Sequence, residues 1–210
     1  KKEVLTEFES EKILKSYLPI AKNQLIKNLK ELKLKKYPLV LKIMSKQALH
    51  KSDIKGVRIV HSREELEKSF NDLIKISKRK KLKLQGILIQ EYREGHQLFL
   101  GIKKDPVFGH ILLFGLGGIY VEILKDISMR ACPIAINDAS SMIDNLKTKD
   151  ILYGARGNKI NLNLLKRLLI KTSKIPNKYP HLTVLDINPL IMNEKEAVVV
   201  DARMVFEKTL

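Results

Sequence analysis

A glycine-rich turn follows an apolar run in the second half of the chain. Residues 108–126 read FGHILLFGLGGIYVEILKD, in which Ile111–Phe114 is typical of a strand and the last residues are compatible with a helix. The turn holds Gly115, Gly117 and Gly118. Because these residues lack a Cβ, their backbone N–H groups could approach an anion such as a phosphate. The alternative is that the glycines serve only the close packing of a strand-to-helix turn.

A single lysine interrupts a strand-like run nearer the N-terminus. Lys42 lies in the middle of Leu39–Met44, whose other residues are all apolar. An ammonium group inside an apolar strand needs a counter-charge, because burying it alone is costly. A bound phosphate would supply that charge. The alternative is an edge strand on which Lys42 faces the solvent.

The polar segment after this run contains a histidine. His50 stands in SKQALHKSDIKG, residues 45–56, and is followed by Lys51, Ser52 and Asp53. An imidazole in this position could act as a nucleophile, as a base or as a bystander, and its chemistry alone favours a surface histidine. Neither Cys nor His accompanies it at the spacing of a metal site, so zinc is not expected.

Two carboxylates and an amide form the third group of candidate residues. Asp186 and Asn188 are two residues apart in a strand-like run, so their side chains should project from the same face. The next strand of a hairpin could bring Asp201 beside them. This oxygen-rich set suits Mg²⁺ bridged to phosphates. The alternative is an Asp-Asn turn with an unrelated surface aspartate.

Helices and strands alternate along the chain and would position these groups. Apolar spacing and helix-start signals predict helices at residues 5–16, 21–34, 62–78, 137–147 and 161–173. Strands are predicted at residues 39–44, 56–60, 86–92, 97–102, 111–114, 183–187 and 197–200. This pattern indicates an α+β protein with two α/β lobes, residues 1–85 and 86–210, divided after a lysine-rich run.

Composition excludes some function classes. The net charge of +17 would suit nucleic acid, but aromatic residues make up only 6% and are not interleaved with the basic runs. We therefore expect a solvated basic surface and no nucleic-acid partner. No apolar run approaches the ~20 residues that span a bilayer, so no membrane association is expected. The single cysteine, Cys132, indicates a buried thiol and a reducing cytoplasm.

Nine segments give the chain a recognisable resemblance. They read LTEFESEKIL, YPLVLKIMS, HKSD followed by GV, QGILIQEY, DPVFG, FGLGGIYVEILKDIS, GARG, LDINPL and VDAR. Over essentially its whole length the chain resembles the ATP-grasp β subunit of ADP-forming acyl-CoA synthetases (acetate–CoA ligase, ADP-forming), which are relatives of succinyl-CoA synthetase. The resemblance implies an ATP-grasp fold with the nucleotide between two lobes. It also implies reversible conversion of acyl-CoA, ADP and phosphate to acid, ATP and CoA.

The resemblance implies a role for each candidate residue. His50 is similar to the histidine that carries the phosphate before its transfer to ADP. The positions similar to nucleotide-binding residues are Lys42, Gln90, Glu91, Tyr92 and Gln97. The positions similar to phosphate-binding glycines are Gly56, Gly115, Gly117 and Gly118, and those similar to Mg²⁺ ligands are Asn188 and Asp201, with Asp186 nearby. The family further implies ATP or ADP as the substrate nucleotide and a CoA-binding α subunit, in an α2β2 assembly, that supplies the thioester chemistry.

Some positions depart from the family pattern. Lys55, Gln97 and Val184 stand where the family commonly has glycine, an acidic residue and glutamate. These departures support an alternative, a regulatory or binding module that keeps the ATP-grasp fold without transferring phosphate. Because His50 and the metal pair are retained, we expect a working ligase. Nucleic-acid binding, a third possibility, rests on net charge alone.

Overall fold

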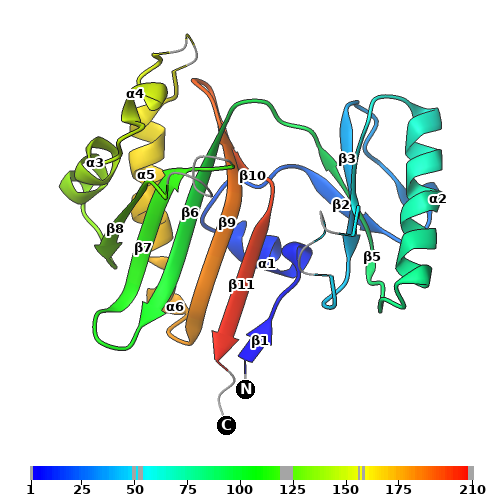
Figure 1. Ribbon diagram of the computed structural model, residues 1–210, viewed down its shortest axis with the longest axis horizontal. Coiled ribbons are helices and arrows are strands. Elements are labelled where there is room, and N and C mark those ends of the chain that lie inside the picture. The colour runs from blue at the N-terminus through cyan, green and yellow to red at the C-terminus, as the bar shows by residue number, and fades with distance from the viewer. Residues whose placement is uncertain are drawn as a thin grey trace. The chain divides into compact units, whose positions relative to one another are not determined.

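The computed structural model describes residues 2–48, 51, 54–118, 125–155, 157 and 159–207 (Figure 1). The chain forms two compact units. The larger unit comprises Lys1–Leu5, Ser10–Ile20 and Glu94–Leu210, and the smaller unit comprises Thr6–Glu9 and Ala21–Arg93. Each unit contains an antiparallel sheet with helices packed against it, so the predicted α+β class is confirmed.

The smaller unit is built on a four-stranded sheet. Its strands, in spatial order, are β2 (Asn23–Ile26), β5 (Gly86–Glu91), β3 (Leu39–Met44) and β4 (Val57–Val60). Helix α2 (Arg63–Arg79) packs against one face of this sheet through Leu66, Phe70 and Leu73 (Figure 1). Ser62 caps α2 by accepting a hydrogen bond from the N–H group of Glu65, as the sequence predicts.

Strand β3 explains why its lysine is buried. Leu39, Leu41 and Ile43 are fully buried in the core under α2, and each contributes about 1.5–3 kcal/mol relative to exposure. Since side chains alternate along a strand, Lys42 points to the opposite face. β3 lies between β5 and β4 and Lys42 is only 6% exposed, so the alternative of a solvent-facing edge strand is wrong.

The helix predicted for residues 21–34 does not form. This segment contains β2, which pairs with β5 from Asn23 opposite Gln90 to Ile26 opposite Ile87, and the short 3-10 helix η1 (Leu29–Glu31). The leucines whose spacing suggested a helix belong to these two elements and the residues beside them instead. Pairing with a distant strand has therefore overridden a weak local preference.

The larger unit is built on a seven-stranded sheet. Its main path runs β1 (Lys2–Val4), β11 (Ala202–Glu207), β9 (Leu182–Met192), β6 (His96–Asp105), β7 (Gly109–Leu116) and β8 (Ile127–Ala131), and β10 (Ala197–Val199) also pairs with β9. Among the described residues, the other helices are α1 (Glu7–Leu14), α3 (Ile136–Asp144), α4 (Lys149–Leu152), α5 (Leu162–Ser173) and α6 (Ile175–Lys178). α3 and α5 pack beside β7 and β8 (Figure 1).

Most predicted elements are confirmed. The other four predicted helices are present as α1, α2, α3 and α5, and every predicted strand is present, with β6, β7 and β9 longer than expected. Strands β1, β8 and β11 and helices α4 and α6 lie outside the predicted elements. No helix within the described ranges has both the length and the apolar character needed to cross a bilayer.

The division into units differs from the predicted one after residue 85. β5 belongs to the smaller unit because it pairs with both β2 and β3. The segments Lys1–Leu5 and Ser10–Ile20 belong to the larger unit, where β1 pairs with β11 and the N–H group of Met204 donates to Ser10 Oγ. One of the boundaries between the units therefore falls within α1, between Glu9 and Ser10.

Cys132 lies half-buried beside the core of the larger unit. Burial raises the pKa of its thiol to about 11, although a hydrogen bond from the Leu112 backbone opposes the shift. The thiolate is the reactive form, and only a small fraction exists near neutral pH. We expect iodoacetamide at pH 8 to alkylate the native protein at least about ten-fold more slowly than the protein in urea, even though a more basic thiolate is more nucleophilic. Equal rates would contradict a raised pKa of the Cys132 thiol in the folded protein.

Candidate functional site

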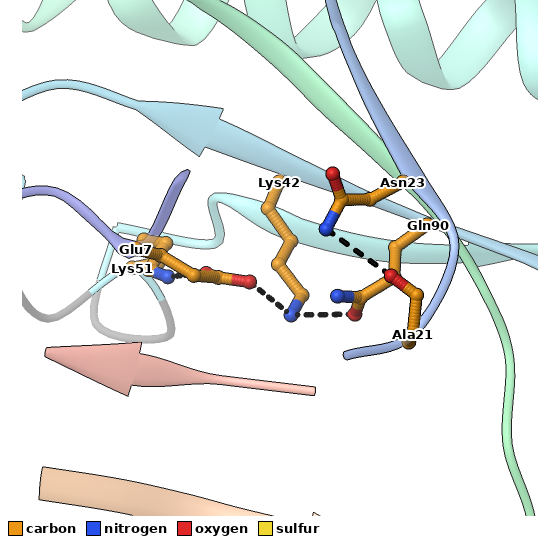
Figure 2. Close-up of polar contacts among 6 residues, drawn as sticks. All are labelled: Glu7, Ala21, Asn23, Lys42, Lys51 and Gln90. Carbon is orange, nitrogen blue, oxygen red and sulfur yellow. Dashed lines mark hydrogen bonds and ion pairs between the residues drawn. The ribbon is translucent and has the colours of Figure 1, made fainter. Parts of the chain in front are cut away.

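Lys42 is the centre of a buried polar cluster in the smaller unit. Its Nζ donates to Glu7 Oε1 at 2.7 Å and to Gln90 Oε1 at 3.0 Å (Figure 2). Gln90 lies on β5 opposite Val40, two residues along β3 from Lys42, so the strand register places both side chains on the same face. Glu7 and Gln90 are 4% and 1% exposed, which makes these hydrogen bonds fully desolvated.

The second oxygen of Glu7 holds another lysine. Glu7 Oε2 accepts a hydrogen bond from Lys51 Nζ (Figure 2), and the carbonyl of Lys51 accepts one from the N–H group of Gly56 at 2.7 Å. Sequence reasoning missed both Glu7 and Lys51 as site residues. A buried lysine needs an acidic partner. The partner of Lys42 is 35 residues away in the sequence, and nothing in the sequence indicates which of the many carboxylates it is.

The charged groups of this cluster are nearly excluded from water. The cluster contains two ammonium groups and one carboxylate, and the side chains of Lys42, Lys51 and Glu7 are 8%, 10% and 1% exposed. Ammonium groups in such surroundings interact strongly with oxygen atoms that carry negative charge. The arrangement is therefore suited to bind a phosphate by charge-assisted hydrogen bonds.

The first turn of α1 also carries a more exposed ion pair. Glu9 lies 3.7 Å from Lys46 and accepts hydrogen bonds from the N–H and Oγ1 groups of Thr6. Partial burial pushes the pKa of Glu9 upward, but the Thr6 bonds and the charge of Lys46 outweigh it, so this pKa lies below its ordinary value. The Lys46 side chain is 50% exposed, which makes this pair a solvated one.

Two further residues predicted to bind nucleotide lie at the end of the same strand: Glu91 is the last residue of β5, and Tyr92 follows it directly. The N–H group of Glu91 donates to the Lys22 carbonyl at 2.9 Å, and that of Tyr92 donates to the Pro38 carbonyl at 3.2 Å. The Glu91 carboxylate is paired with Arg93. Both N–H groups therefore already donate hydrogen bonds within the protein. A nucleotide base bound at this position would have to form its hydrogen bonds with other groups of the segment.

The predicted metal residues belong to the larger unit. Asp186 and Asn188 lie on one face of β9, and the N–H group of Asn188 donates to the Asp201 carbonyl at 3.2 Å. Arg203, opposite Asp186 in the β9–β11 pairing, places its guanidinium 3.5 Å from the Asp186 carboxylate. The set of two carboxylates and one amide is made of hard oxygen donors and fits Mg²⁺. Asp186 is partly engaged by Arg203.

The four predicted phosphate-binding glycines differ in their backbone hydrogen bonds, contacts and conformation. The N–H groups of Gly56 and Gly117 already donate to the carbonyls of Lys51 and Gln97, each at 2.7 Å. A Cβ on Gly115 would lie 2.5 Å from the Asp126 carbonyl oxygen, so this glycine is required by strand packing. Gly118 has a φ of +61°, a conformation that favours glycine.

The remaining predicted residues are placed as follows. Gln97 is exposed on β6 beside Gly117 and Gly118 in the larger unit. His50, and the helix-compatible run at residues 119–124 after the glycine turn, lie outside the described residues. The structure thus gathers Lys42 and Gln90 in one unit, and Gln97, the glycine turn and the metal candidates in the other.

A separate cavity of about 570 Å³ lies within the larger unit. Residues Glu94–His96, Gly157, Lys159 and Asn193–Lys195 line it, and Lys159 pairs with Glu194 at 3.5 Å. None of the predicted site residues that the structure describes lines this cavity.

Comparison with known proteins gives a consistent picture. The model of the ATP-grasp domain family matches residues 1–206. The subunit beta of acetate–CoA ligase [ADP-forming] I from Pyrococcus furiosus is 38% identical over 211 residues, which cover 96% of this chain and 91% of that protein. Acetate–CoA ligase [ADP-forming] I from Archaeoglobus fulgidus is 38% identical over 173 residues, 80% of this chain but only 25% of that protein.

Solved structures agree with these matches. The Ca. Korarchaeum cryptofilum dinucleotide forming acetyl-coenzyme A synthetase 1, in complex with coenzyme A, Ca-AMPCP and HgCl⁺, superposes with a TM-score of 0.93 at 35% identity, covering 98% of this chain and 94% of that one. Another structure of that enzyme holds coenzyme A and Mg-AMPPCP, with its phosphohistidine segment pointing towards the nucleotide binding site; it gives a TM-score of 0.86 at 32% identity, covering 97% and 93%. The predicted ATP-grasp fold is confirmed.

Proposed function

This chain belongs to the ATP-grasp domain family, and from that premise we propose that it is the nucleotide-binding β subunit of an ADP-forming acyl-CoA synthetase. The enzyme is an acid–thiol ligase of the acetate–CoA ligase type. It converts acyl-CoA, ADP and phosphate reversibly to acid, ATP and CoA, and this chain transfers phosphate between a phosphohistidine and ADP. The names of relatives that match almost the whole chain support this assignment.

The buried cation cluster is the observation that carries the proposal. Lys42 on a central strand, with Lys51 beside it on the same carboxylate, supplies positive charge where a nucleotide's phosphates would need it. Because both lysines are nearly excluded from water, their attraction for a phosphate is stronger than it would be at the surface. Gln90 orients Lys42 through its amide oxygen.

The proposal also assigns a magnesium site to the larger unit. Asn188 and Asp201, with Asp186 nearby, would hold Mg²⁺, which offsets the charge of the transferring phosphate when bound. His50 accepts and donates the phosphate. Gln97 and Gly118 belong to the same unit as the metal residues and contribute to binding of the nucleotide and phosphate.

Thioester chemistry requires a second component. The chain spans about a quarter of the Archaeoglobus fulgidus relative but nearly all of the Pyrococcus furiosus subunit, so related domains exist both inside longer chains and as separate subunits. We propose a CoA-binding α subunit, in an α2β2 assembly, as the partner of this chain. We place the enzyme in the cytoplasm.

The proposal is tested by incubating the full chain with γ-labelled ATP, with and without Mg²⁺ and with and without the α subunit. Covalent label that is stable to base, lost in acid and dependent on Mg²⁺ is the expected result, because a P–N bond is acid-labile. Nucleotide binding without label under any condition would instead favour the module that has lost phosphate transfer. Val184 is the structural feature that favours this alternative, since it lies on the same face of β9 as Asp186 and adds no carboxylate there.

A further inference from the structure

We propose that Arg203 binds a phosphate group of the nucleotide directly, beside the candidate magnesium residues of the larger unit. This inference rests on the proposed function, because it adds a residue to the proposed nucleotide site. Arg203 was not among the candidates that the sequence offered.

Arg203 lies on the same side of the larger sheet as the metal candidates. It stands opposite Asp186 in the β9–β11 pairing, and its guanidinium is 3.5 Å from the Asp186 carboxylate. Asn188 follows Asp186 by two residues on β9 and so projects from the same face. The N–H group of Asn188 donates to the carbonyl of Asp201, which directly precedes β11. The guanidinium is therefore a neighbour of the residues that would hold Mg²⁺.

The guanidinium of Arg203 uses few of its hydrogen-bond donors within the described part of the chain. Its only ion pair there is the one with Asp186, and its buried Nε atom has no hydrogen-bond partner there. Charge-assisted N–H···O hydrogen bonds are usually about 2.7–2.9 Å long. The Arg63–Glu67 pair on α2 reaches 2.7 Å, whereas the Arg203–Asp186 pair stays at 3.5 Å. Arg203 thus has donors to offer to another group.

The neighbours of Arg203 indicate that this group is a phosphate. The planar fork of a guanidinium matches two oxygens of a phosphate. Asn188 and Asp201, with Asp186, offer hard oxygen ligands that suit Mg²⁺, and Mg²⁺ in proteins commonly also takes phosphate oxygens of the substrate. A phosphate that is bound to Mg²⁺ has further oxygens, which could accept hydrogen bonds from Arg203. Arg203 and Mg²⁺ would then share the negative charge of one phosphate group.

A purely structural ion pair explains Arg203 less well. The side chains of Arg203 and Asp186 are 34% and 36% exposed, and ion pairs this open to water contribute little to stability. Such a pair also leaves the buried Nε of Arg203 without an acceptor, which costs free energy. Reorientation of the guanidinium toward a ligand oxygen would remove that cost.

The test compares nucleotide with nucleoside binding. Calorimetry measures the affinities of the full chain for adenosine and for Mg-AMPPCP, a non-hydrolysable ATP analogue, at several Mg²⁺ concentrations. We expect Arg203→Met to weaken Mg-AMPPCP binding about ten-fold or more and to leave adenosine binding unchanged. Arg63→Met is the matched control, because it removes an arginine–carboxylate pair outside the proposed site. This control should leave both affinities near wild type.

The Mg²⁺ dependence separates a direct contact from an effect through Asp186. If Arg203 contacts the phosphate, the loss in Arg203→Met persists as Mg²⁺ is raised. A loss that disappears at high Mg²⁺ would show that Arg203 only holds a metal ligand, and it would overturn the inference. Full Mg-AMPPCP affinity in Arg203→Met, or an equal loss for adenosine, would overturn it as well.

Two further comparisons keep the test decisive. Should Arg203→Met fail to fold, which thermal denaturation would reveal, Arg203→Lys keeps the charge but lacks the planar fork, and it is judged by the same criteria. A wild type that binds Mg-AMPPCP yet takes up no label refutes phosphate transfer but not this inference, whereas a wild type without Mg-AMPPCP affinity refutes both.

Discussion

Replacing His50 with alanine is expected to abolish acid-labile labelling and to lower turnover by more than about 1,000-fold. In the proposed reaction the imidazole forms a covalent bond to phosphorus, so its removal eliminates the route rather than slowing one step of it. Labelling from γ-labelled ATP and steady-state formation of ATP from acyl-CoA measure the two effects. Nucleotide affinity should change little, because binding relies on other residues.

His61→Ala is the matched control for this prediction. His61 is an exposed histidine of the smaller unit, between β4 and α2, and has no place in the proposed site. This variant should be labelled and should turn over like the wild type. Label remaining on His50→Ala but lost on His61→Ala would reassign the phosphate carrier, and label on both variants would exclude both histidines.

Replacing Gly115 with alanine is expected to destabilise the larger unit by about 2–3 kcal/mol. Gly115 lies in β7 between Phe99 of β6 and Ile127 of β8, and the new Cβ would lie 2.5 Å from the backbone oxygen of Asp126. A backbone atom in a paired sheet cannot move away as a side chain can. Thermal unfolding should show a midpoint roughly 4–12 °C lower.

Gly109→Asn provides the comparison for Gly115→Ala. Gly109 has a φ of +72°, a Cβ added there would meet no atom of the described residues within 4 Å, and asparagine tolerates this conformation. The midpoint of this variant should stay within a few degrees of the wild type. If Gly115→Ala unfolds normally but binds Mg-ADP more weakly, the glycine serves phosphate binding rather than strand packing.

Much of the fold follows from patterns within single segments. β3 matches its prediction residue for residue because five apolar positions surround one lysine, and α2 begins where the Ser62 cap predicts. Residues 21–34 show where such reasoning ends. Leu25, Leu29 and Leu32 have helical spacing, but the decisive interaction is the pairing of β2 with β5, a strand about 60 residues further on.

The candidate site shows the same limit. The sequence predicted that Lys42, if buried, needs a counter-charge. It left two alternatives, a bound phosphate or an edge strand on which Lys42 faces the solvent. The structure supplies Glu7, whose role depends on the fold bringing the start of α1 to the face of β3 that carries Lys42. Likewise, Gly115 and Gly117 looked alike in the sequence. The structure distinguishes them. The Asp126 carbonyl leaves no room for a Cβ at Gly115, whereas the N–H group of Gly117 donates to the Gln97 carbonyl.

The pairing of β1 with β11 has a consequence for synthesis on the ribosome. It joins Lys2–Val4 to residues 205–207, so the larger sheet lacks a strand until residue 207 has been translated. The four strands of the smaller sheet are all available once Glu91 has emerged. At about 5–20 residues per second, completion of the larger sheet follows that of the smaller one by roughly 6–23 s. Nascent-chain proteolysis should therefore find the smaller sheet protected well before the N-terminal strand is.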